Sequence, residues 1–437
     1  MDIDFDKIRE ENIIEYGAGV RHLSFLGRLY ADKTHFIFEL LQNAEDAKAK
    51  KIKFSLHPDR LEVLHNGKIF NEDPEKDDVR GICGIDESTK TSDLTQIGKF
   101  GIGFKSVYAY TQTPEVHCEN IHFKIEHFVR PYQIETKKIE SGWTTLFVFP
   151  FASTEGDEDL KLFQQTAFEQ ISKRLRRLSV RTLLFLHNLE EIEYTTNTEV
   201  SGYYWRNLEA ERGITRRVSV LGQQGDGEID EEKWIVYSKP IPELNNHLYV
   251  EIAFRVRRNK NDKEIISKLK ESYLNVFFPT EKITHMGFLI QGPYRTTPAR
   301  DNIPQDDNWN KQLVSETAML LQKALLEIKK EGLLTVGLLE TLPLRVEEYP
   351  DNWMFWPVYQ AVQRSFNDNE LLPTANNDFV TASNAKLSRV KGLRSLIDND
   401  QLTDLLESDT PLKWLSGEIT RDLTPILRNY LIHELKI

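Results

Sequence analysis

One short segment, FELLQNAEDA, places three polar side chains at helical spacing. Glu39, Asn43 and Asp46 are separated by four and then three positions, so they share one face of an otherwise apolar helix. Burying an acid is costly unless it is paired or engages a ligand. Two interpretations stay open: a solvated polar stripe, or a site in which the acid activates water and the amide oxygen binds a magnesium ion.

A second candidate is the glycine-rich stretch IGKFGIGFKS at residues 97–106. Its three glycines, at spacings of three and two before an expected helix, allow backbone N–H groups to approach phosphates. The spacing is not that of the dinucleotide-binding fingerprint, and the chain has no Walker A motif. Alone, such a loop is a weak indication of nucleotide binding.

The elements that must position these residues follow from hydrophobic patterning. Apolar residues recur at three- and four-residue spacing over residues 33–51, which predicts a helix with Asp32 as its N-cap. Two short strands joined by a polar turn are expected at residues 52–56 and 61–67. Further strands are expected at residues 122–126 and 144–149, and further helices at residues 157–177 and 309–330.

The order of these features resembles one family. An ExxxNAxDA helix precedes a strand ending in His-Asn-Gly, a Ser-Thr-Lys segment, the GxFGxGF loop and a strand with two threonines. This series resembles the GHKL, or Bergerat-fold, ATPases, and by eye most of all their chaperone and sacsin-type members. The resemblance is strong over residues 15–150 and weaker through the middle segment, where FFPTEKITHMGFLIQGPYRTTPARDNI looks like sacsin-type sequence.

The resemblance implies a role for each matching position. Glu39 would be the general base that activates water, Asn43 would bind Mg²⁺, and Asp46 would line the pocket near the base and ribose. Thr145, or its neighbour Thr144, would lie beneath the adenine. The glycine-rich loop would contact the phosphates through Gly98, Lys99, Phe100, Gly101, Ile102, Gly103, Phe104 and Lys105, and the lid would include Ser88, Thr89 and Lys90.

The chain departs from the family pattern where the base would be recognised. In the family's DxGxG motif the adenine-reading aspartate is here His65, and the second glycine is Ile69. A neutral imidazole, or the amide of Asn66 beside Gly67, could still accept a hydrogen bond from the adenine amine. The alternative is that His65 only caps a strand end and a water molecule reads the base. The choice of adenine over guanine therefore stays open.

A basic residue from the following domain often completes the site in this family. Arg295 and Arg300, in the segment GPYRTTPARDN, are the candidates here. A guanidinium keeps its charge and can bind phosphate through two parallel hydrogen bonds. Arg300 is the preferred catalytic residue, and the structural alternative is an ion pair between Arg300 and Asp301 or Asp306.

A further basic cluster stands near the end of the helix expected at residues 157–177. Arg174, Arg176 and Arg177 are interpreted as a solvated helix face. A contact with nucleic acid or with a partner protein is the alternative.

Composition excludes several classes of protein. The chain has 437 residues, 40% of them apolar, and a net charge of −12, which argues against a surface given wholly to nucleic acid or anionic membrane. Its two cysteines, Cys83 and Cys118, cannot form a disulfide framework. No apolar run approaches the ~18 residues of a membrane span, and the N-terminus lacks a secretory pattern. We expect a multi-domain cytoplasmic protein without a membrane partner.

The expected fold class is α+β. Residues 1–150 would form a two-layer Bergerat-type α/β sandwich, with a mixed, mostly antiparallel sheet covered on one face by helices. A transducer-like α/β domain would follow at residues 151–335, and a smaller mixed region at residues 336–437. Because an apolar helical pattern runs to the last residue, we interpret this region as the start of a longer protein or as a terminus covered by a partner.

The leading functional hypothesis is a magnesium-dependent ATPase, with ATP and Mg²⁺ as its ligands. Binding energy would drive conformational switching in a chaperone-like or defence-related machine, because a ligand shifts an equilibrium by its differential affinity for two states. Self-association through the ATP domain is an expected route to activation, and the protein client is not predicted. An ATP-gated nucleic-acid clamp, disfavoured by the negative charge, and a non-hydrolysing nucleotide sensor are the alternatives.

Overall fold

The computed structural model describes residues 3–19, 23, 32–71, 77–85, 102–153, 159–197, 201–241, 248–297, 302–388, 390 and 392–437. The fold is mixed α+β, as expected, and its strands form a large mixed sheet in which most neighbours run antiparallel. The chain clusters into two compact units. The first comprises mainly Met1–Asn207 with Ser219–Glu232, and the second comprises Leu208–Val218, Lys233–Thr297 and Asp301–Ile437.

These two units are a coarser division than the three domains expected from the sequence. The boundaries at residues 150 and 335 stay predictions. Strands β8 (Ser201–Arg212), β9 (Thr215–Gln224) and β10 (Asp230–Pro240) contribute residues to both units. Within the described ranges, none of the helices combines the length and the apolar character needed to cross a membrane.

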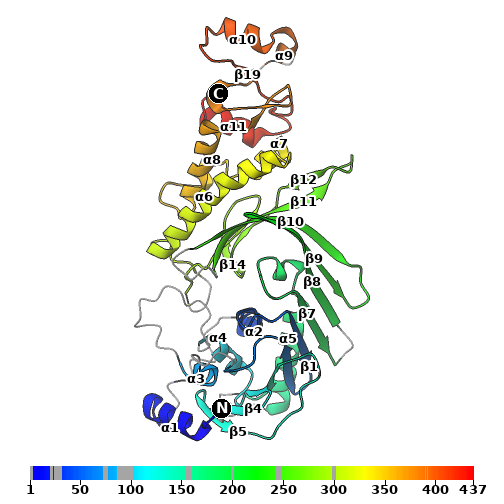
Figure 1. The fold of residues 1–437 in the computed structure, drawn as a ribbon, viewed down its shortest axis with the longest axis vertical. Coiled ribbons are helices and arrows are strands. Elements are labelled where there is room, and N and C mark those ends of the chain that lie inside the picture. The colour runs from blue at the N-terminus through cyan, green and yellow to red at the C-terminus, as the bar shows by residue number, and fades with distance from the viewer. Residues whose placement is uncertain are drawn as a thin grey trace. The chain divides into compact units, whose positions relative to one another are not determined.

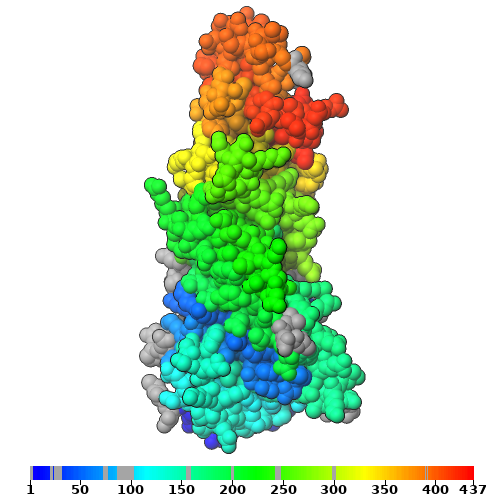
Figure 2. All heavy atoms as spheres, turned by 90° about the vertical axis from the view of Figure 1, so that its right-hand side faces the viewer, coloured from blue at the N-terminus to red at the C-terminus, as the bar shows by residue number. Residues whose placement is uncertain are grey.

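The sheet of the first unit has the strand order β7-β1-β2-β6-β3-β4-β5. Strands β1 and β7 pair in parallel, and the other neighbours pair antiparallel. Figure 2 shows the consequence on one face, where blue atoms of the β1–β2 region lie between cyan and blue-green atoms. The strands are β1 (Lys51–Leu56), β2 (Arg60–His65), β3 (Glu115–Cys118), β4 (Ile121–Glu126), β5 (Arg130–Gln133), β6 (Thr145–Pro150) and β7 (Glu191–Thr196).

The helix expected at residues 33–51 is present but shorter. A 3₁₀ turn, η2 (Lys33–His35), leads into α2 (Phe36–Asp46), and the Asp32 carboxylate accepts from the Thr34 N–H at 2.9 Å, which confirms the predicted cap. The chain leaves the helix before residue 51 because β1 already begins there. The other helices of this unit are α1 (Phe5–Tyr16), α3 (Asp78–Cys83), α4 (Ile102–Lys105), η3 (Ser106–Ala109), α5 (Leu160–Leu175) and η4 (Val180–Leu183).

An aromatic cluster fixes α2 and α4 on the sheet. Phe147 and Phe149 alternate along β6 and therefore point to the same face. The ring of Phe36, at the start of α2, lies 6.4 Å from that of Phe149, and the ring of Phe104, in α4, lies 5.8 Å from that of Phe147. Both helices thus cover one face of the sheet, which places the predicted base and the end of the glycine-rich stretch in one layer.

The second unit continues with the order β14-β13-β15-β11-β10, and β12 pairs with β11. The helix expected at residues 309–330 is confirmed as α6 (Asn308–Lys330), which lies against β11 and α8 (Figure 1). The strands are β11 (Tyr249–Arg258), β12 (Glu264–Ser267), β13 (Tyr273–Val276), β14 (Phe278–Ile283), β15 (Leu289–Gln291), β16 (Leu372–Pro373), β17 (Phe379–Val380), β18 (Ala385–Lys386) and β19 (Lys413–Trp414). The remaining helices are α7 (Val336–Leu339), η6 (Val346–Glu348), α8 (Trp356–Asp368), η7 (Ala382–Asn384), α9 (Leu393–Leu396), α10 (Asn399–Leu405) and α11 (Pro425–His433).

Candidate functional site

Among the buried polar side chains of helix α2, Glu39 and Asn43 lie one turn apart. Glu39 is 4% exposed and Asn43 is 7% exposed. The Glu39 carboxylate lies 3.5 Å from Nε2 of His35, one turn earlier. The Asn43 side-chain nitrogen is buried and has no hydrogen-bond partner in the described part of the chain. Because the two ends of an amide are assigned from their hydrogen bonds, one end of this amide is unsatisfied in either orientation.

The start of α4 closes on Glu39. A Cβ atom added to Gly103 would lie 2.2 Å from Oε2 of Glu39, so no residue with a side chain fits there without moving the carboxylate. The structure thus brings the predicted base together with the last glycine of the predicted phosphate loop. The other predicted loop and lid residues, Gly98, Lys99, Phe100, Gly101, Ser88, Thr89 and Lys90, lie outside the described residues, as does the side chain of Ile102.

At its other end, α2 abuts the end of β2. A Cβ on Gly67 would lie 2.6 Å from the carbonyl oxygen of Ala47, the residue that caps α2. The Thr144 hydroxyl donates to the carbonyl oxygens of His65 at 3.1 Å and Gly67 at 2.7 Å. Thr145 is buried and pairs in register with His65. The predicted positions on β2, α2 and β6 therefore meet at one end of the sheet.

His65 and Asn66 are both engaged with the main chain. Burial lowers the pKa of His65 to about 4, so the ring is neutral at physiological pH. Its Nδ1 accepts from the Gly67 N–H at 3.2 Å, which leaves the proton on Nε2 and makes that atom a donor. The Asn66 side-chain oxygen accepts from the N–H groups of Lys50 and Lys51, both at 2.9 Å. Neither acceptor expected for an adenine amine is thus available in this arrangement.

Asp46, the last residue of α2, has an unusual proton affinity. Desolvation, and then the neighbouring carboxylates of Glu45 and Glu39, raise its pKa to about 8. The side chain is nevertheless exposed, so solvent screens part of this effect. Asp46 therefore takes up a proton more readily than an ordinary aspartate, and in that form it can donate a hydrogen bond as well as accept one.

Two residues assigned to the phosphate loop have structural contacts in the first unit. The ring of Phe104 is buried in the aromatic cluster. The Lys105 ammonium is fully buried and donates to the carbonyl oxygens of Ile82 at 2.7 Å, Cys83 at 3.3 Å and Phe128 at 2.6 Å. Burial lowers the pKa of Lys105 to about 8. Since three carbonyls occupy its three donors, the ammonium holds the end of α3 in place.

Glu45, a buried acid next to the predicted site residues, is not among the residues predicted from the sequence. Glu45 is 5% exposed, and its carboxylate accepts from the N–H groups of His187, Asn188 and Leu189, each at 2.8 Å. These residues lie between α5 and β7. The one signal in the sequence was an acid inside an apolar helix, and its partners are more than a hundred residues away along the chain.

Of the two candidate arginines, the structure describes only Arg295. In the second unit the Arg295 guanidinium lies 3.0 Å from the Asp307 carboxylate, and the Arg295 N–H donates to the Asn310 side-chain oxygen at 2.8 Å. Arg300 lies outside the described residues. In the part of the chain that the structure describes, no three His, Cys, Asp or Glu side chains are grouped so as to hold a metal ion.

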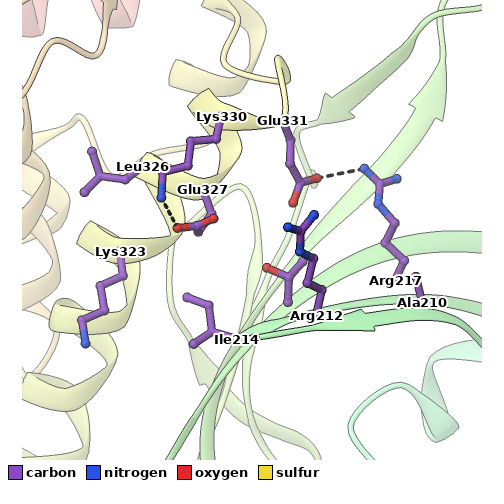
Figure 3. Close-up of a pocket in the computed structure, with 11 residues that line it drawn as sticks. Ala210, Arg212, Ile214, Arg217, Lys323, Leu326, Glu327, Lys330 and Glu331 are labelled. Carbon is purple, nitrogen blue, oxygen red and sulfur yellow. Dashed lines mark hydrogen bonds and ion pairs between the residues drawn. The ribbon is translucent and has the colours of Figure 1, made fainter.

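The second unit also contains a cavity of about 830 Å³ between the β8–β9 hairpin and the end of α6 (Figure 3). Its charged side chains largely pair with one another. Arg217 binds Glu331 at 2.9 Å and Lys330 binds Glu327 at 2.6 Å, as the dashed lines in Figure 3 show. Two of its four cations, Arg212 and Lys323, lie outside these pairs.

Comparison with known proteins gives two sequence relatives. Residues 61–125 match the Sacsin domain family. The chain is 28% identical to Protein NO VEIN of Arabidopsis thaliana over 328 residues, covering 68% of this chain and 11% of that protein. It is 37% identical to human Sacsin over 98 residues, covering 20% of this chain and 2% of that protein. The chain thus spans about a tenth or less of the length of these curated relatives.

Among solved structures, the chain is similar to a crystal structure of the N-terminal domain of a DNA repair protein. The sequence identity is 13% and the TM-score 0.37, over 65% of this chain and 92% of that one. A score at this level is too low to assign the fold.

Proposed function

We propose that the first unit is a GHKL-type ATPase domain that binds ATP with Mg²⁺ and hydrolyses it. One observation carries the proposal: the buried amide of Asn43, which is unsatisfied within the described ranges, lies one helical turn from the buried carboxylate of Glu39. A buried polar atom without a partner calls for an explanation, and a ligand that completes its hydrogen bonds or coordination is one. The sequence similarity to sacsin and NO VEIN is compatible with this assignment.

The residues present fit a magnesium ion that arrives with the nucleotide. A carboxylate and an amide oxygen are ligands that Mg²⁺ accepts, and this ion commonly uses one or two protein ligands and completes its shell with phosphate oxygens and waters. Asn43 would hold the ion, which when bound neutralises phosphate charge.

Glu39 would accept the proton of the attacking water. A general base must lie within hydrogen-bond reach of the proton it removes, and the approach of the Glu39 carboxylate to the last glycine of the proposed phosphate loop supports this role. Gly103 allows that approach because it has no side chain to displace the carboxylate. Arg300 remains our proposed γ-phosphate contact, since the guanidinium of Arg295 is already paired with Asp307.

We further propose that discrimination between ATP and GTP is weak. The His65 ring presents a donor at Nε2, and the Asn66 oxygen already accepts two main-chain hydrogen bonds. Neither offers the acceptor that an adenine amine requires. A comparison of dissociation constants for the two nucleotides tests this point directly.

The test of hydrolysis compares wild type with Glu39→Gln, which keeps the shape of the side chain and removes its basicity. Calorimetry would measure Mg²⁺-dependent ATP binding, and phosphate release would measure turnover. We expect similar affinity in both proteins and a loss of turnover of about 100-fold or more in the variant. The matched control is Glu10→Gln, an exposed acid of α1, which should behave as wild type.

Each other outcome has a distinct meaning. Binding without turnover in either protein would favour the non-hydrolysing sensor, and no nucleotide binding at all would refute the proposal. Salt-dependent DNA binding stimulated by ATP would favour the nucleic-acid clamp. Within the leading hypothesis, the ATPase serves as a conformational switch in a chaperone-like or defence-related machine.

A further inference from the structure

Another cavity, in the first unit, is lined mainly by cationic side chains. It measures about 400 Å³ and lies between α5 and the segment that begins α2. This size is at the lower end for ligand sites. Four of its lining side chains are cationic and one is anionic: Lys33, Lys173, Arg174 and Arg177 against Asp32. The cavity shares no residue with the proposed nucleotide site.

The single carboxylate does little to neutralise these cations. Asp32 already accepts from the N–H and the hydroxyl of Thr34, at 2.9 and 2.6 Å. Its closest approach to Arg174 is 3.8 Å. Lys33, Lys173 and Arg177 form no ion pair with any side chain in the described ranges. Like charges held together without counter-charges repel each other, so the cluster favours an anion from outside.

Arg174 is held in position with binding capacity left over. Its guanidinium carbon lies 4.4 Å from the ring centroid of Phe38 on α2, which fixes the plane of the group. Its Nε is buried and lacks a hydrogen-bond partner among the described residues. Burial lowers the pKa of Arg174, Arg177 adds to this shift, and Asp32 opposes it. The positive charge at this position is therefore under-compensated.

The cavity of the second unit provides an internal comparison. There, two of four cations bind carboxylates that line the same cavity at 2.9 and 2.6 Å (Figure 3). Near Arg174 the described lining residues form one pair, between Asp32 and Arg174, and its distance is longer, at 3.8 Å. Both cavities have four cations, but the cavity at Arg174 has a single lining carboxylate where the other has two, in a chain whose net charge is −12.

We propose that the cavity at Arg174 binds a small molecule bearing adjacent phosphate groups. Guanidinium groups match phosphate oxygens in geometry, and lysines add charge without fixing direction. Several cations within one small cavity suit a ligand with more than one negative charge, of which inorganic pyrophosphate is the simplest. Arg174 is the central ligand, and Lys173 and Arg177 contact the second phosphate.

Calorimetry with inorganic pyrophosphate, on the full chain without Mg²⁺, tests the proposal. We expect Arg174→Gln to weaken binding by about tenfold to a hundredfold and Arg177→Gln by several-fold, as for charged hydrogen bonds. Arg176→Gln is the matched control, because Arg176 is exposed on the same segment, does not line the cavity and carries the same charge. It should leave the dissociation constant unchanged.

Two further arms identify the source of the phosphate and the location of the site. A 12-nucleotide oligothymidylate replaces pyrophosphate in one arm, and Asn43→Ala, in the proposed nucleotide site, is the variant in the other. The proposal predicts tighter binding of pyrophosphate than of the oligonucleotide per phosphate, and no effect of Asn43→Ala. The proposal is overturned if pyrophosphate does not bind at millimolar concentration, or if only the oligonucleotide binds. It is also overturned if Arg176→Gln weakens pyrophosphate binding as much as Arg174→Gln does, or if only Asn43→Ala abolishes pyrophosphate binding. Because Arg177 is exposed, its variant keeps the test valid if Arg174→Gln proves unstable.

Discussion

At the scale of single residues, the structure separates side chains with binding capacity left from those already used. Asn43 has a buried amide nitrogen without a hydrogen-bond partner in the part of the chain that the structure describes. The Lys105 ammonium donates to three carbonyl oxygens, and the Asn66 side-chain oxygen accepts from two N–H groups, so neither is available to a ligand. The sequence motif assigns all three residues to the same site. Their hydrogen bonds show which of them can still bind a ligand. We therefore place Glu39 and Asn43 in the proposed chemistry and Lys105 in the framework.

Asp46 gives a prediction of pH dependence. Its pKa in the folded chain is raised from 3.8 to about 8, so the folded protein keeps this proton where the unfolded chain has released it. The stability that this proton contributes is present below pH 4 and is lost as the pH rises towards 8. Asp46→Asn cannot ionise, so its thermal midpoint should rise relative to wild type between pH 4.5 and pH 8. Parallel curves would contradict this, and Asp226→Asn, in an exposed turn, is the control.

At the scale of elements, α2 is held at three places. Gly103 of α4 closes on Glu39, Gly67 packs against Ala47, and Glu45 binds the segment between α5 and β7. The parallel pairing of β1 with β7 adds a further link to residues beyond 150. The position of the candidate base therefore depends on chain that follows the motif region by more than thirty residues.

Glu45→Gln tests this dependence. The carboxylate accepts from His187 and Asn188 through Oε1 and from Leu189 through Oε2, so the NH₂ group of an amide would face at least one of these N–H donors. Leaving buried donors unpaired should lower the free energy of unfolding of the first unit by about 2–4 kcal/mol. Denaturant unfolding measures this. The control is Glu190→Gln, whose exposed pair with Lys50 should contribute no more than about 1 kcal/mol; an equal loss in both variants would refute the role of Glu45.

At the scale of the whole molecule, the arrangement of charge narrows the functional alternatives. A net charge of −12 disfavours a general nucleic-acid surface, while the basic cavity concentrates positive charge at one place. The chain corresponds to about a tenth or less of NO VEIN and sacsin, so the activities of those whole proteins enter here only as proposals. The switch hypothesis requires a response from both units, because nucleotide bound to the first unit must change the conformation of the second.

Hydrogen exchange tests that demand. With Mg²⁺ and a non-hydrolysable ATP analogue, we expect slower amide exchange in α2 and β2 of the first unit and also at residues 292–297 of the second, near Arg295. Glu39→Gln should preserve both effects because it retains binding, and Asn43→Ala should abolish both. Protection confined to the first unit would favour a nucleotide sensor without the switch.

The local elements and the candidate catalytic residues can be predicted from the sequence alone. Periodicity placed α2, the β1–β2 hairpin and α6 to within a few residues, because amphipathic patterns and caps act over short distances. The ExxxN spacing likewise placed Glu39 and Asn43 on one face without knowledge of the fold.

Which side chains remain free to bind a ligand, and where cationic side chains cluster, follow from the tertiary structure and not from the sequence pattern. The partners of Lys105 lie more than twenty residues away and those of Glu45 more than a hundred, and no local pattern encodes such pairings. The same holds for Arg174, which the sequence places on a solvated face and the fold sets against Phe38 in a cavity. Desolvation and hydrogen-bond satisfaction depend on neighbours brought together by packing, and these two effects define the candidate sites.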